Sequence, residues 1–219
     1  MFSEGQINCE GKELTQIKRI GIDLDDTAVD YGSLYLRAIM MGLGINIPAL
    51  YPNGFSCRTS ELPEIAALPQ GPAFINNLIK RELFYRIAEP IPGAVETLNE
   101  WRNTGFNIWF ITARMSNLSE VTFEWLRNHN LGWAVEKTIL KEDPLEHSGE
   151  YKNRICRQLD LQAIIDDSPK VLSAINAPSV RLRIGLKKIW NMQSSEQSCG
   201  YNFYDNWQEI RTVIEYLTE

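Results

Sequence analysis

Short apolar runs alternate with amphipathic segments over most of the chain, and this alternation limits the folds that the chain can adopt. The runs that predict strands are 18–23, 107–112, 135–140, 163–166 and 180–184. The segments whose apolar residues recur at helical spacing are 94–103, 118–128, 151–159, 169–176 and 207–217. Strands that alternate with helices favour a parallel sheet with helices on both of its faces. We therefore predict an α/β protein built on such a sheet.

The segment that follows the first predicted strand interrupts this alternation. Helical patterns cover 31–43 and 74–86, and prolines break the chain between them into loops and short helices. We predict that residues 31–88 form a small helical cap inserted after the first strand. Residues 1–30 and 89–219 then make up the α/β core domain, which begins with a loose leader.

The composition bounds the class of protein. A chain of 219 residues fits one ordinary domain with a small inserted lobe, and 44% hydrophobic with 23% charged residues is typical of a globular protein. The formal net charge of -6 offers no basic surface for long nucleic acid. The four cysteines are scattered without metal-site spacing, which favours reduced thiols and a cytoplasmic location. We expect neither a signal peptide nor a membrane-spanning segment.

Two aspartates follow the first predicted strand. Asp23 and Asp25 stand two residues apart, and a strand places such residues on the same side. Two close carboxylates repel one another unless a cation sits nearby or one of them holds a proton. The pair therefore suits the binding of a hard cation and attack on phosphorus, and the alternative is a solvated acidic turn.

The ends of later predicted strands also carry polar side chains. Thr112 ends the second predicted strand, Asp166 and Asp167 end the fourth, and Lys152 begins the helix before the fourth. Each has an ordinary alternative, which is a helix cap for the threonine or the aspartates and a surface position for the lysine. Ligands bind beyond the carboxyl ends of the strands in open α/β sheets, so the coincidence favours one site.

These residues together suit the hydrolysis of a phosphate ester. Mg²⁺ would bridge Asp23, Asp166 and a phosphate oxygen, and Asp23 would attack phosphorus in line. Asp25 would protonate the leaving oxygen and then deprotonate the water that hydrolyses the aspartyl-phosphate intermediate. Thr112 and the backbone N–H groups after it would hold the phosphate oxygens, and Lys152 would stabilise the charge at phosphorus.

The order of these motifs resembles that of the haloacid dehalogenase superfamily of aspartate-nucleophile phosphatases. The DxDxT run at 23–27, Thr112, Lys152 and the Asp166–Asp167 pair occur here in that family's order. The resemblance implies a Rossmann-like, haloacid dehalogenase-like fold and Mg²⁺ dependence. It also implies that Asp25 touches the metal through its backbone carbonyl, so the predicted metal ligands are Asp23, Asp25 and Asp166.

Segments between the motifs resemble the cytosolic and mitochondrial 5'(3')-deoxyribonucleotidases. These segments are 89–94, 124–126, 138–140 and 205–210. The resemblance implies hydrolysis of (deoxy)nucleoside monophosphates and a helical cap at the position predicted here. We therefore expect a small phosphorylated substrate, and the sequence leaves a homodimer open.

Aromatic residues of the cap, Tyr31 and Tyr85 among them, could stack on a base or fill the cap core. We assign the six tryptophans to packing.

Two positions depart from that family's pattern. The second motif reads Thr112-Ala113-Arg114, where that family tends to have Thr-Ser-Pro. An arginine at this site resembles the motif of polynucleotide 3'-phosphatases and some sugar phosphatases, and it could hold a phosphate or a second anionic group. The lysine of that family closely follows the third strand, where this chain has Lys141, whereas Lys152 stands after an apparent insertion at 142–150. We assign substrate binding to Thr112, Ala113, Arg114 and Lys152, with Lys141 as the alternative to Lys152. The rival functions are a phosphatase for polynucleotide 3' ends or sugar phosphates, and a non-catalytic binding module.

Overall fold

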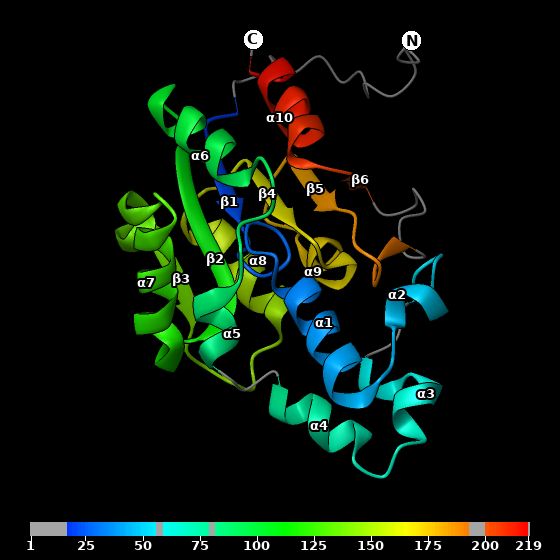
Figure 1. Cartoon of the computed structure of the whole chain (residues 1–219). Coiled ribbons are helices and arrows are strands. Elements are labelled where there is room, and N and C mark those ends of the chain that lie inside the picture. The colour runs from blue at the N-terminus through cyan, green and yellow to red at the C-terminus, as the bar shows by residue number, and fades with distance from the viewer. Residues whose placement is uncertain (1–16, 56–58, 79–81, 193–199, 219) are drawn as a thin grey trace.

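A computed structural model describes residues 17–55, 59–78, 82–192 and 200–218 (Figure 1). The predicted leader, 1–16, lies outside the described residues. Six strands form one sheet in the order β3-β2-β1-β4-β5-β6, and every neighbouring pair is parallel. Their bounds are β1 Arg19–Ile22, β2 Asn107–Met115, β3 Thr138–Lys141, β4 Ala163–Asp166, β5 Leu182–Leu186 and β6 Asn202–Tyr204. The predicted α/β fold with a parallel sheet is confirmed.

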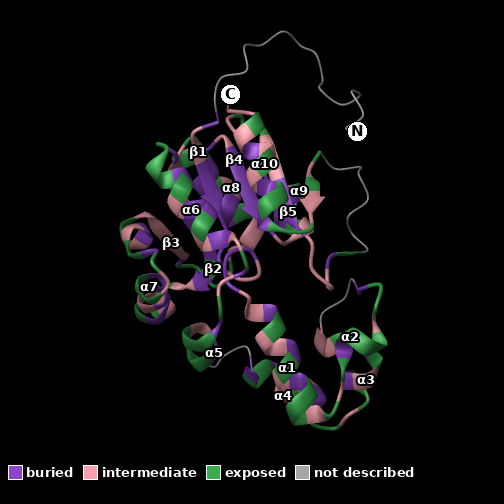
Figure 2. Ribbon diagram, turned by 45° about the horizontal axis from the view of Figure 1, so that its top comes forward, coloured by how far each residue is buried: buried purple, intermediate pink, exposed green. Residues whose placement is uncertain are grey.

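Helices cover both faces of the sheet because side chains alternate along each strand. On one face, Ile20 and Ile22 of β1 pack with α6 (Ala94–Asn103), α7 (Ser119–Asn128) and α10 (Trp207–Tyr216). On the other face, Ile111 of β2 and Ile164 of β4 pack with α8 (Ser148–Gln158) and α9 (Pro169–Ala174). The central strands therefore run through the middle of the buried core (Figure 2).

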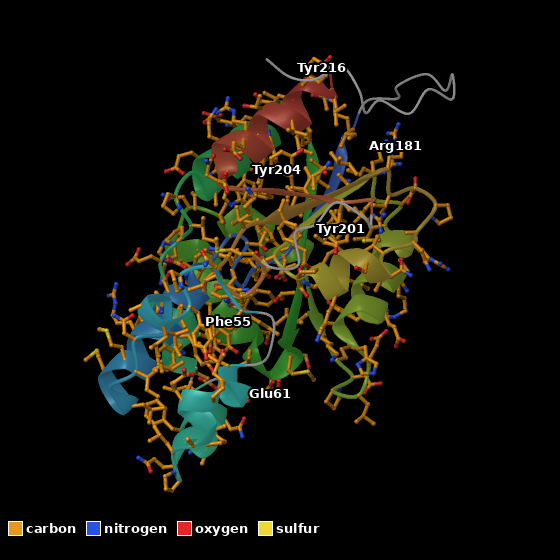
Figure 3. The ribbon with its side chains drawn as sticks, turned by 90° about the vertical axis from the view of Figure 1, so that its right-hand side faces the viewer. Phe55, Glu61, Arg181, Tyr201, Tyr204 and Tyr216 are labelled. Carbon is orange, nitrogen blue, oxygen red and sulfur yellow. The ribbon has the colours of Figure 1, made fainter. Side chains whose placement is uncertain are left out.

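The helices that follow β1 and precede α6 belong to the inserted segment, which lies at one end of the sheet (Figure 1). They are α1 Tyr31–Leu43, α2 Ile47–Leu50, α3 Pro63–Ala66, α4 Gly71–Leu78 and α5 Glu82–Ile87, with a 3-10 turn, η1, at Thr59–Glu61. Their buried side chains form an apolar cluster separate from the two that flank the sheet. Figure 3 shows Phe55 within this segment, away from Tyr204 on the edge strand β6. This separate core supports the division into cap and core domain, which remains a prediction.

The structure differs locally from the predicted elements at four places. The expected helix over 74–86 corresponds to α4 and α5, between which residues 79–81 are not described. The apolar residues before β3 belong to a 3-10 segment, η3 (Gly132–Lys137), whose Ala134 is buried. Strand β2 runs past Thr112 to Met115, after which a 3-10 turn, η2 (Ser116–Leu118), precedes α7. Strand β6 was not predicted. Its extended conformation depends on pairing with β5, and its own sequence carries no strand pattern.

Within the described ranges, no helix has both the length and the apolar character that crossing a lipid bilayer requires.

Candidate active site

The site lies where the direction of the strand order reverses. Strand β1 has β2 on one side and β4 on the other, and such a switch point is where open α/β sheets bind ligands. Ile22 of β1 pairs with Ile165 of β4, and the backbone N–H of Asp23 donates to the Ile165 carbonyl at 2.9 Å. Asp23 therefore leaves β1 beside the end of β4, which carries Asp166.

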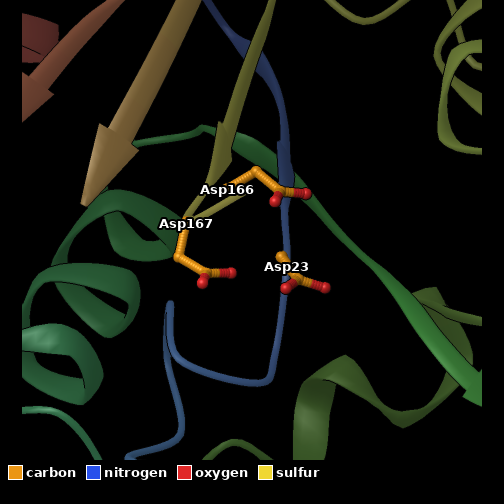
Figure 4. A group of neighbouring side chains, drawn as sticks. All are labelled: Asp23, Asp166 and Asp167. Carbon is orange, nitrogen blue, oxygen red and sulfur yellow. The ribbon is translucent and has the colours of Figure 1, made fainter. Parts of the chain in front are cut away.

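Three carboxylates converge at this point, as Figure 4 shows. Oxygens of Asp23, Asp166 and Asp167 lie within 4.8 Å of one another, and Asp23 and Asp166 are buried. Burial, reinforced by the other carboxylates, raises the pKa of Asp23 well above its ordinary value and that of Asp167 to about 7. Clustered carboxylates are relieved by a cation or by a bound proton, and their oxygens are the ligands that a hard divalent ion prefers, so the donor set fits such an ion. Asp167 was absent from the predicted ligand set.

Lys152 supplies one positive charge to this cluster. Its Nζ lies 2.6 Å from Oδ1 of Asp23 and 2.6 Å from Oδ2 of Asp166, and the residue is only 2% exposed. Burial alone would lower the pKa of Lys152, but the two carboxylates raise it above the ordinary value, so the lysine is charged. It lies one turn inside α8, which begins at Ser148, and not at the helix start as expected.

Lys141, the alternative lysine, occupies a different place. It ends β3, and β2 separates that strand from β1. Lys141 is buried and pairs in register with Met115 of β2. The lysine whose ion pair with Asp23 the structure records is Lys152, which supports the predicted preference for it.

Arg114 forms hydrogen bonds with the predicted acid/base residue, Asp25. Its Nε donates to both carboxylate oxygens of Asp25, at 3.1 and 3.0 Å, and its Nη2 donates to Oδ1 at 2.6 Å. Its Nη1 donates to the Thr122 hydroxyl at 3.2 Å, and the guanidinium carbon lies 4.6 Å from the centre of the Tyr85 ring. The expectation that Arg114 holds a phosphate or a second anionic group of the substrate stays a prediction. The partner that the structure records for its side chain at this edge of the sheet is Asp25.

Thr112 marks the last regular pairing of β2 with β3. Beyond this residue the register shifts, and Ala113 is exposed. Thr112 itself is fully buried, and its Oγ1 accepts a hydrogen bond from the backbone N–H of Arg114 at 3.2 Å. The hydroxyl proton therefore remains available to donate to another group.

The loop after β5 adds two residues that sequence reasoning missed. Nε1 of Trp190 donates to Oδ2 of Asp167 at 2.7 Å, and Nδ2 of Asn191 donates to the Asp167 carbonyl at 2.7 Å. Trp190 also lies against Gly32 in α1, where an added Cβ would fall 2.1 Å from its ring. Its assignment to packing was therefore incomplete. The sequence signal that could have placed Trp190 near the site was its position after β5, which ends at the same edge of the sheet.

The fold and this site define a haloacid dehalogenase-like α/β protein, and solved structures share that fold. A haloacid dehalogenase family hydrolase from Deinococcus radiodurans, solved with phosphate and sodium, is 16% identical, with a TM-score of 0.61. The match covers 93% of this chain and 97% of that one. A provisionally assigned hydrolase of the same superfamily from Bacillus subtilis, bound to magnesium, is 16% identical, with a TM-score of 0.58 over 92% of this chain and 100% of that one.

Sequence comparison points the same way. A curated Bacillus cereus protein, provisionally named a nucleotidase, is 29% identical over 166 residues, which are 72% of this chain and 80% of that protein. A family model described as the LNS2 domain of PITM 1-3 matches residues 78–168, less than half of the chain. The chain has the haloacid dehalogenase-like fold and resembles nucleotidases, as its motifs predict.

Proposed function

We propose that this chain is a Mg²⁺-dependent phosphomonoesterase that hydrolyses (deoxy)nucleoside monophosphates through an aspartyl-phosphate. The observation that carries the proposal is the contact of Asp23, at the switch point of the sheet, with the buried cation of Lys152 at 2.6 Å. A carboxylate held beside a fixed positive charge can approach an anionic phosphate and attack it. The nucleotidase name of the Bacillus cereus relative supports the substrate class.

Asp23, Asp166 and Asp167 would hold the metal, with the backbone carbonyl of Asp25 as a further ligand. Mg²⁺ bound there would neutralise charge on the substrate phosphate and on the cluster. The convergence of three carboxylates supports this assignment, and the magnesium in the Bacillus subtilis neighbour is consistent with it.

The protein's own groups carry the two chemical steps. Asp23 attacks phosphorus in line while Asp25 protonates the departing alkoxide oxygen. Asp25 then removes a proton from the water that hydrolyses the aspartyl-phosphate, which returns Asp23 to its free form. The Thr112 hydroxyl and the backbone N–H groups near Ala113 hold the phosphate oxygens, and Lys152 stabilises the charge that they gain.

The inserted segment supplies the side of the site on which the leaving group would lie. Tyr31 and Tyr85 stack with ring centroids 5.1 Å apart, and Tyr85 covers the arginine that grips Asp25. Tyr31 also stacks with Tyr35, at 6.4 Å, so these rings pack mainly on one another. An aromatic surface beside the site supports a nucleoside as the leaving group without selecting a base. The division into a 31–88 cap and a core of 1–30 and 89–219 belongs to this proposal, as does a cytoplasmic location.

The rival functions, a phosphatase for polynucleotide 3' ends or sugar phosphates, rest on Arg114. The contact of its guanidinium with Asp25 gives this residue a role other than binding substrate, which supports a nucleoside monophosphate as the favoured substrate. A non-catalytic module would be favoured only if no phosphomonoester were hydrolysed.

A panel of phosphate esters assayed with Mg²⁺ tests the proposal, with Asp23→Asn as the disabled variant. Asp160→Asn is the matched control, because Asp160 is an exposed aspartate paired with Arg19 on the surface. We expect nucleoside monophosphates to be preferred, Asp23→Asn to be inactive but folded, and Asp160→Asn to keep wild-type rates. Undiminished hydrolysis by Asp23→Asn would refute the mechanism, and equal rates on all esters would refute the substrate class.

A further inference from the structure

The fork of hydrogen bonds between Arg114 and Asp25 has no place in the steps above. We infer that Arg114 is a positioning residue that holds the acid/base carboxylate of Asp25 in place and that it does not bind the substrate phosphate. The inference rests on the proposed function, because it concerns how Asp25 performs its part in that reaction.

The geometry of the pair fixes the carboxylate rather than merely neutralising it. Nε reaches both oxygens of Asp25, at 3.1 and 3.0 Å, and Nη2 reaches Oδ1 at 2.6 Å. A planar guanidinium that contacts a carboxylate at several points restricts its rotation, which a point charge such as lysine does not. The arginine side chain is 1% exposed and that of Asp25 is 29% exposed. The carboxylate that Arg114 holds therefore stays partly exposed, so a substrate could reach it.

The arginine is itself held by two other elements. Nη1 donates to the hydroxyl of Thr122 in α7, at 3.2 Å. Tyr85 of α5, in the inserted segment, lies over the guanidinium at 4.6 Å, a distance at which an aromatic face attracts a cation. Arg86 of α5 forms an ion pair with Glu124 of α7, so these two helices are also joined directly. Strand β2, α7 and α5 thus fix the guanidinium from three directions.

These contacts separate two roles that a site arginine can have. All three guanidinium nitrogens donate to protein oxygens, and two of them donate to Asp25. An arginine that binds phosphate assists every substrate equally, because the phosphoryl group is common to all of them. An arginine that orients a general acid matters most when the leaving oxygen needs a proton, and least when the leaving group is stable as an anion.

The experiment compares two esters in single-turnover assays of the full chain with Mg²⁺, following release of the alcohol or phenol. The esters are the best nucleoside monophosphate of the panel, whose alkoxide must be protonated, and p-nitrophenyl phosphate, whose phenolate leaves without a proton. The variants are Arg114→Lys, which keeps the charge but loses the fork, and Thr122→Val, which removes one support. Arg154→Lys is the matched control, because Arg154 makes a similar two-nitrogen contact with Glu146 on the surface.

We expect Arg114→Lys to slow nucleoside release by at least about 100-fold and p-nitrophenol release by less than about tenfold, with little change in KM. Thr122→Val should also slow nucleoside release more than p-nitrophenol release, but by a smaller factor. Arg154→Lys should match wild type on both esters. Equal losses on the two esters would overturn the inference, and a raised KM with them would assign Arg114 to the phosphate.

Two further results distinguish a variant that fails to fold from one that loses activity. If Arg114→Lys loses its cooperative melting transition, Thr122→Val decides, and equal losses on both esters in that variant would also overturn the inference. If the wild-type chain releases product from no ester, the proposed function fails and the inference fails with it. If the wild-type chain hydrolyses both esters and the variants lose activity equally on the two, the inference fails and the proposed function stands.

Discussion

The ammonium group of Lys152 bridges Asp23 and Asp166, with Nζ 2.6 Å from an oxygen of each. The three side chains come from α8, the end of β1 and the end of β4. Because all three are buried, neither carboxylate can replace the lysine by contact with bulk water. The ion pairs therefore make both the stability of this region and the orientation of Asp23 depend on one side chain.

Replacing Lys152 with methionine should remove activity and destabilise the protein. We expect kcat to fall by about 1,000-fold and the free energy of unfolding to fall by about 3 kcal/mol, because two buried carboxylates lose their cation. Denaturant unfolding and steady-state kinetics measure the two effects. Lys137→Met is the control, since Lys137 donates to Asn107 and lies over the Trp109 ring, both outside the site. A Lys152→Met protein with kcat near that of wild type would contradict the assignment.

Magnesium should stabilise the folded protein, and Asp167 should contribute to that effect. In metal-free protein at neutral pH, Asp167→Asn should melt at a higher temperature than wild type, because it relieves repulsion between the carboxylates. Added Mg²⁺ should raise the melting temperature of wild type more than that of Asp167→Asn. Calorimetry with EDTA and then with excess Mg²⁺ provides the measurement. Equal Mg²⁺-induced shifts in the two proteins would show that Asp167 is not a ligand.

Trp190 should tune the metal site through its hydrogen bond to Asp167. Trp190→Phe keeps most of the ring but removes the Nε1 donor that lies 2.7 Å from Oδ2. We expect the Mg²⁺ concentration for half-maximal activity to rise by about tenfold, as is common when a partner of a metal ligand is removed. Trp133→Phe loses a similar bond, to Asn99 at 2.8 Å, and should leave the Mg²⁺ requirement unchanged. The same requirement in both variants would refute this role.

Gly32 should be intolerant of a side chain because α1 begins against Trp190. A Cβ at this position would lie 2.1 Å from the Trp190 ring and 2.8 Å from Oδ1 of Asp26. We expect Gly32→Ala to reduce the free energy of unfolding by about 2 kcal/mol and to raise the Mg²⁺ requirement, because Trp190 must shift. Gly132→Ala, whose Cβ would meet its nearest atom at 3.6 Å, is the control. Unchanged stability of Gly32→Ala would contradict the packing.

The sequence predicted the elements that carry their own pattern. The ranges 31–43 and 94–103 match α1 and α6, because apolar spacing and the adjoining glycines define both helices. Asp23 and Asp166 could be grouped because parallel strands end at one edge of a sheet, so strand ends could be compared without coordinates. Lys152 was added from the helix that leads into the Asp166 strand. The short strand β6 could not be found in this way, since it depends on pairing with β5.

The contacts that sequence reasoning missed join segments far apart in the chain. Arg114 forms hydrogen bonds with Asp25, 89 positions away in the chain, and no local pattern around either residue indicates this pairing. Trp190 reaches Asp167 from an irregular loop after β5, where no periodicity indicates direction. The residue types were visible in both cases, but their partners are set by tertiary packing.

The central claim is that Asp23 becomes phosphorylated during turnover. The most direct measurement quenches the enzyme during hydrolysis of a nucleoside monophosphate, reduces any acyl phosphate with borohydride and maps the product by mass spectrometry. Borohydride converts an aspartyl-phosphate to homoserine, so the account predicts homoserine at position 23 only when substrate is present. An active enzyme that is labelled at another residue, or at none, would contradict it.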